Sequence, residues 1–133
     1  MVHMAAGVPV FVTALLLGGL PAPQTRAPDA AAHKAWMDDA ADLQDELREQ
    51  LLAKAGDKAA AAAIEIERIL AQTQAYWAAK HADDIVTIAQ ESRTLATAVA
   101  TAAKAGKIDQ AAEASATMGA RCNACHDLHP EKR

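Results

Sequence analysis

The chain has 133 residues and a formal net charge of -4, with 17 acidic and 13 basic side chains. This length suits one domain with its own core. The lysines and arginines are dispersed, whereas a nucleic-acid partner requires them in clusters. Aromatic residues make up only 3% of the chain, while alanine, the best helix former, is abundant. The composition therefore predicts one helical domain without a nucleic-acid partner.

The N-terminal segment differs in character from the rest. Residues 5–20 form an apolar run without Lys, Arg, Asp or Glu, and prolines follow it. A membrane span needs ~20 residues, so the run better fits a secretory signal peptide, although no Lys or Arg precedes it. An uncleaved anchor is the alternative. We expect residues 1–27 to be a signal peptide, residues 28–133 to form the mature domain, and the protein to be periplasmic.

The mature chain carries helical patterns and no strand pattern. Proline is missing between Pro28 and Pro130, so nothing in that stretch forbids helix. Three interruptions divide it, at Gly56, near residues 80–82 and at Gly106. The expected fold is all-α, an antiparallel up-down four-helix bundle, with helices over residues 30–54, 57–79, 83–105 and 108–127.

The ends and faces of these helices follow from their polar and apolar residues. Gly56 is expected as the residue that ends the first helix, and Asp57 and either Asp83 or Asp84 as N-caps. Apolar residues recur at three- and four-residue steps, as on the buried face of a helix. The residues expected to face inward are Trp36, Ala40, Leu43, Leu47, Leu51, Ile66, Ile69, Leu70, Thr73, Trp77, Ile85, Ile88, Ser92, Leu95, Val99, Ile108, Ala111, Ser115, Met118, Cys122 and Cys125.

The motif with the clearest chemistry lies near the C-terminus. Residues 122–126 read Cys-Asn-Ala-Cys-His and include the only two cysteines of the chain, and Cys-x-x-Cys-His is the attachment signature of c-type haem. Residues three and four apart share one face of a helix. Cys122 and Cys125 could therefore form two thioether bonds while His126 binds the iron. We expect one covalent haem c inside the bundle, where it supplies apolar burial that alanine-rich helices lack.

Two other chemistries are compatible with the cysteines. A thiol–disulfide centre usually follows a strand in a βαβ pattern, which is absent from this sequence. A zinc site could use Cys122, Cys125, His126 and His129, but ligands so close together on one helix cannot easily surround a metal tetrahedrally. The sequence therefore favours haem over both alternatives.

With this motif at the end of four expected helices, the chain resembles the class II cytochromes c, which include cytochrome c′ and cytochrome c-556. The resemblance covers about residues 30–128 and implies Cys122 and Cys125 as the attachment residues and His126 as the proximal ligand. It is carried by the motif at 122–126, by Gly119, by Ala-Lys-Ala-Gly at 103–106, and by Tyr76-Trp77 and Ala-Asp-Asp at 82–84, which are similar to related small bacterial haem proteins.

The resemblance also points to residues on the distal side of the haem. The first helix of this family often has an Arg four residues before a Met beside the distal face, and the corresponding residues here are His33 and Met37. Met37 could bind the iron, as in cytochrome c-556, or only pack against the porphyrin, as in cytochrome c′. His33 could contact a propionate, compete with Met37 for the iron, or lie in solvent, which the start of a helix favours. Arg121 could pair with a propionate or lie free on the surface.

Two functions fit these expectations. The first is an electron carrier that exchanges single electrons with unidentified periplasmic proteins. The second, implied by the resemblance to cytochrome c′, is a five-coordinate haem protein that binds nitric oxide or carbon monoxide. We do not expect an enzyme, because no nucleophile–base pair or phosphate-binding loop is apparent. The resemblance suggests a homodimer through the first two helices, although the acidic surface of the first offers no apolar patch for it.

Overall fold

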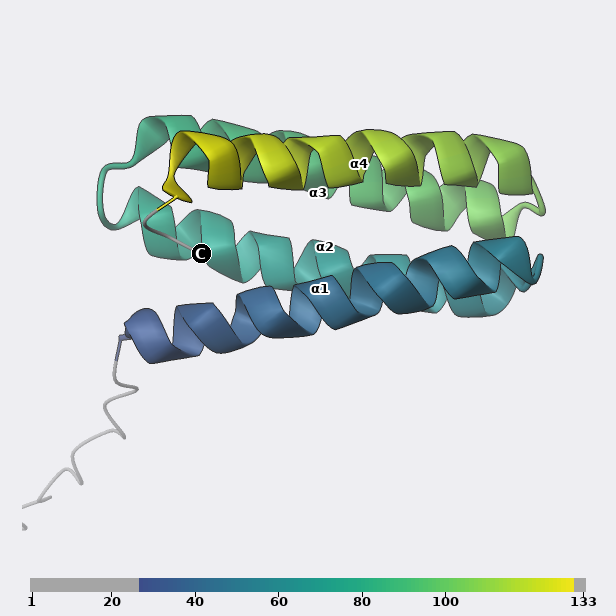
Figure 1. Cartoon of the computed structure of the whole chain (residues 1–133), viewed down its shortest axis with the longest axis horizontal. Coiled ribbons are helices and arrows are strands. Elements are labelled where there is room, and N and C mark those ends of the chain that lie inside the picture. The colour runs from purple at the N-terminus through teal and green to yellow at the C-terminus, as the bar shows by residue number, and fades with distance from the viewer. Residues whose placement is uncertain (1–26, 131–133) are drawn as a thin grey trace, which may run out of the picture.

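The computed structural model describes residues 27–130, which contain four helices and no strand. They are α1 (Ala30–Leu52), α2 (Gly56–Ala78), α3 (Asp83–Lys104) and α4 (Ile108–Leu128). Successive helices run in opposite directions and are joined by short connections (Figure 1). The expected all-α, up-down four-helix bundle is therefore confirmed for this range. The expected signal peptide lies almost wholly outside the described residues.

The breaks between helices fall where they were predicted, with one change of role. Gly106 has a backbone φ of 74°, and His81 and Lys54 take the same left-handed conformation with φ of 57° and 55°. Gly56 does not end α1, as expected, but is the first residue of α2. A Cβ atom at Gly56 would overlap the carbonyl oxygen of Ala103. Glycine is therefore needed here because the start of α2 closely approaches the end of α3.

The expected N-caps are also displaced by one or two residues. Ala55 and Ala82 hold the N-cap positions of α2 and α3 and provide no side-chain hydrogen bond. Asp57, Asp83 and Asp84 instead lie in the first turns. Their negative charges interact favourably with the positive end of the helix dipole. The acidic residues still stabilise these helix starts, by charge rather than by capping.

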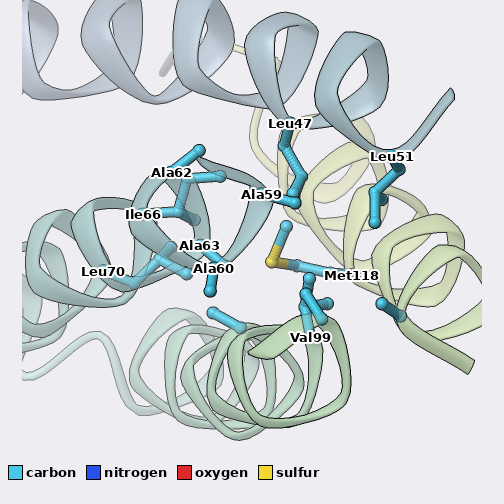
Figure 2. Packing of buried hydrophobic residues seen from close by; sticks show 13 residues of the cluster. Leu47, Leu51, Ala59, Ala60, Ala62, Ala63, Ile66, Leu70, Val99 and Met118 are labelled. Carbon is cyan, nitrogen blue, oxygen red and sulfur yellow. The ribbon is translucent and has the colours of Figure 1, made fainter. Parts of the chain in front are cut away.

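The predicted inward faces agree with the observed packing, because every residue of the expected stripes is buried or half-buried. One end of the bundle is filled by Leu47, Ile66, Val99 and Met118, each no more than 1% exposed. Figure 2 shows the Met118 side chain reaching toward Leu47 and Val99. Small residues complete this core and let the helices approach closely: Ala59, Ala60, Ala62, Ala63, Ala96, Ala103 and Ala111.

The other end of the bundle is built differently. Alternating directions bring the first turns of α1 and α3 to the same end as the last turns of α2 and α4, on the left in Figure 1. At this end the helices enclose the cavity described below. Within residues 27–130, none of the helices combines the length and the apolar character needed to cross a membrane.

Candidate functional site

The candidate site is a cavity of about 50 Å³, partly open to solvent, that all four helices line. Cys122, Cys125 and His126 reach it from α4, and His33 and Met37 from α1. The remaining wall is mostly apolar and consists of Leu70, Thr73 and Trp77 on α2 and Ile85, Ile88, Ala89 and Ser92 on α3. The structure therefore brings the motif and both predicted distal residues to one cavity.

The position of the motif follows from the packing of α4. Ala111 and Met118 are fully buried on this helix, and Cys122 and Cys125 continue the same face at helical spacing. Beyond the motif, the side chain of His129 lies 2.6 Å from a carboxylate oxygen of Asp84 at the start of α3. This hydrogen bond lowers the pKa of Asp84. The last turns of α4 are thereby held on both sides of the motif.

The two thiols lie in surroundings that favour their neutral form. Burial raises the pKa of Cys122, and the neighbouring Cys125 raises it further, while a hydrogen bond with Ser92 acts in the opposite direction. Burial also raises the pKa of Cys125, with a smaller effect from the charge of Asp84. A reactive dithiol acts as a thiolate and lies where the thiol pKa is lowered. These surroundings therefore do not favour the dithiol alternative.

The zinc alternative also lacks a suitable geometry. His129, the fourth proposed ligand, is paired with Asp84 and is absent from the cavity lining. Within the part of the chain that the structure describes, no three His, Cys, Asp or Glu side chains converge in a way that could hold a metal ion. The four residues of this alternative are neighbours in sequence but not ligands around one point.

His33 is buried, so the expectation that it lies in solvent is wrong. It is only 8% exposed, and its Nε2 accepts a hydrogen bond of 3.0 Å from the indole Nε1 of Trp77. Its ring stacks on Tyr76 with centroids 4.8 Å apart, and Trp36 approaches it edge-on. A sequence signal existed: His33 precedes Ala40 by two helical turns and so belongs to the buried face of α1.

The other two predicted residues lie in different surroundings. Met37 is half-buried and lines the cavity, where its thioether is available to a group bound there. Arg121 lies outside the cavity lining and forms an ion pair with Glu91 of α3, with Nε and Oε2 3.2 Å apart. Both partners of that pair are substantially exposed. Arg121 therefore links α3 and α4 on the surface.

Thr73 is a cavity residue whose polar role sequence reasoning missed. Its Oγ1 is buried and has no hydrogen-bond partner among the described residues. Four threonines elsewhere in the bundle bond to the carbonyl four residues earlier at 2.9–3.1 Å: Thr87, Thr94, Thr101 and Thr117. A buried hydroxyl without a partner costs stability, and buried polar groups usually have partners. The Thr73 hydroxyl is therefore suited to a molecule bound in the cavity.

Replacing Thr73 with valine tests this interpretation in the chain without a bound molecule. Valine has the same shape and removes the unsatisfied hydroxyl, so we expect the free energy of unfolding to rise by about 1 kcal/mol. Urea unfolding followed by circular dichroism measures this change. Thr87→Val is the matched control, because it removes a satisfied, exposed hydroxyl from a helix. A loss of stability in Thr73→Val would show that the hydroxyl has a partner within the protein.

Fold and cavity together define a class: a four-helix bundle with a Cys-x-x-Cys-His motif on the wall of an internal cavity. Comparisons of the chain with protein-family models, curated proteins and solved structures returned no match. The case for a cofactor therefore depends on the residues themselves. Two thiols and an imidazole from α4, with mostly apolar side chains lining the rest of the cavity, form a donor set that fits haem c.

Proposed function

We propose that this chain is a periplasmic c-type cytochrome that carries single electrons through one covalent haem c. The observation that carries the proposal is that Cys122, Cys125 and His126 all line one mostly apolar cavity from α4. The resemblance to class II cytochromes c supports it, since that family places its haem motif at the end of a four-helix chain. Its partners would be periplasmic redox proteins of unidentified nature.

Each residue would have a distinct role. Cys122 and Cys125 would hold the haem by thioether bonds, which do not dissociate, and His126 would bind the iron on the proximal side. The apolar residues from α2 and α3 would exclude water from the haem. Bound haem supplies a ferric/ferrous couple, whose potential depends on axial ligands, burial and nearby hydrogen bonds.

Met37 is the residue that favours electron transfer over other haem chemistry. It lies on α1 and lines the same cavity as His126 of α4. A thioether on the iron raises the reduction potential, as in the Met/His cytochromes. A protein with both axial positions filled by its own side chains would exchange electrons without binding an external ligand. Met37 ligation would make this cytochrome such a carrier.

A second candidate function is the binding of nitric oxide or carbon monoxide at a five-coordinate iron. The unsatisfied hydroxyl of Thr73 favours it, because a small polar ligand in the cavity would give this group a partner. In this case Met37 would only pack against the porphyrin, as its flexible side chain readily does. The two candidates differ in whether the sixth position is filled by the protein.

Absorption spectra of the protein, matured in a host that attaches c-type haem, test the proposal. We expect a six-coordinate, low-spin spectrum in the wild type, and a five-coordinate spectrum that responds to carbon monoxide in Met37→Ala. Leu43→Ala, a half-buried residue of α1 outside the cavity lining, serves as the control. A wild type that is already five-coordinate and binds carbon monoxide rapidly would instead support the gas-binding candidate. A protein without haem would contradict both.

A further inference from the structure

The hydrogen bond between His33 and Trp77 defines the chemical state of the His33 ring. Trp77 Nε1 carries a hydrogen and can only donate, so His33 Nε2 must be the acceptor of this 3.0 Å bond. A nitrogen that accepts a hydrogen bond carries no proton. In a neutral imidazole the proton then resides on Nδ1. The structure thus favours one tautomer of His33.

This tautomer leaves His33 without a lone pair for a metal. The Nε2 lone pair points at the indole N–H, and the Nδ1 lone pair is used by the N–H bond. An imidazole binds iron through an unprotonated nitrogen. His33 could therefore act as an axial ligand only after the hydrogen bond with Trp77 is broken.

The surrounding rings hold His33 in this arrangement. Tyr76 stacks on it with an interplanar angle of 17°, and Trp77 meets it nearly at right angles, at 84°. Both partners come from the last two turns of α2, and Trp77 is only 8% exposed. A ring confined on one face and at one edge cannot rotate toward the cavity centre without disrupting this packing.

We infer that Trp77 determines which side chain of α1 can bind the iron, by holding His33 away from it and leaving the sixth position to Met37. This inference rests on the proposed haem function, since it concerns ligands of the same iron. His33 and Met37 lie one helical turn apart on α1 and line the same cavity. Imidazole generally competes well for haem iron. By keeping His33 off the iron, the hydrogen bond from Trp77 would determine the axial ligand and hence the reduction potential.

Trp77→Phe in the full, haem-loaded chain is the direct test. Phenylalanine keeps an aromatic ring in place but removes the N–H donor, so His33 Nε2 loses its hydrogen bond with residue 77. We expect about a tenfold rise in the fraction of iron bound by a second imidazole, the factor that corresponds to one lost hydrogen bond. The electron paramagnetic resonance spectrum would show a bis-imidazole species. The reduction potential would fall, because Met/His ligation gives a higher potential than ligation by two imidazoles.

Three further variants make the result specific. In His33→Gln the side-chain oxygen can still accept from Trp77 while the imidazole is lost, so the wild-type spectrum should remain. The double variant Trp77→Phe, His33→Gln should also return to the wild-type spectrum. Trp36→Phe is the matched control, because Trp36 touches the His33 ring edge-on at a centroid distance of 6.3 Å, and its spectrum should not change.

The tautomer can be measured without haem. Nitrogen-15 chemical shifts of His33 in the haem-free full chain should show a protonated Nδ1 and an unprotonated Nε2; the opposite tautomer would overturn the inference. In the haem-loaded protein, an unchanged Trp77→Phe spectrum would overturn it, as would loss of the wild-type spectrum in His33→Gln. These results leave the proposed cytochrome function intact. Absence of haem from the wild type would overturn that function and, with it, this inference.

Discussion

The double substitution Cys122→Ser, Cys125→Ser is expected to abolish covalent haem attachment. Each thiol would form one thioether bond, and a serine hydroxyl cannot replace it. Both cysteines line the cavity from the same face of α4, so one haem would use both. Mass spectrometry of the denatured protein should show the added mass of one haem in the wild type and none in the double variant. Each single variant should retain one bond and give reduced yields of attached haem.

The structure provides a matched control beside the cysteines. Asn123 lies between them on α4 but is exposed and absent from the cavity lining, so Asn123→Ala should leave haem attachment unchanged. Haem that remains covalently bound in the double variant would contradict the assignment of both cysteines. A wild type without added mass would contradict the proposed cytochrome function itself.

Removal of haem is expected to lower the thermal unfolding midpoint by about 10 °C or more. A group bound only to the folded chain stabilises it by mass action, and covalent attachment strengthens that effect. The apolar cavity occupies one end of the bundle, and α1 as a whole packs mainly against α2 and much less against α4. A loss of about 2 kcal/mol at this end corresponds to a shift of about 10 °C for a domain of this size.

Far-UV circular dichroism melts of the haem-free and haem-loaded proteins measure this difference. Leu47→Ala is the control for the end of the bundle without the cavity, because Leu47 is fully buried in the core there. This substitution should cost about 2–5 kcal/mol in both forms. Equal midpoints for the haem-free and haem-loaded wild type would show that the cavity end is stable by itself.

Local and periodic features of the sequence predicted most of the fold. The number of helices, their approximate limits and the inward faces follow from interruptions and from apolar spacing, because a helix repeats every 3.6 residues whatever its neighbours are. The motif at residues 122–126 likewise requires only short spacings on one helix. These properties depend on residues close together in the chain, which the sequence displays directly.

Contacts between helices determined other features, which the sequence alone did not predict. Gly56 has the signature of a helix end, yet its role comes from the backbone of Ala103, about a third of the chain away. Burial of His33 depends on the indole of Trp77 and the ring of Tyr76 on another helix. The spacing of His33 from Ala40 indicates the buried face of α1, but only these partners on α2 give its polar ring a buried hydrogen bond and stacking surface.

The residues of the cavity also differ in whether the sequence or the packing of helices determined their position. The sequence by itself determined that Cys122, Cys125 and His126 share one face of a helix. Only the tertiary structure decided that Met37 lines the same cavity while Arg121 does not, because helix packing sets which faces meet. It also left the hydroxyl of Thr73 without a partner, since an unfilled hydrogen bond becomes visible only when every neighbour is known.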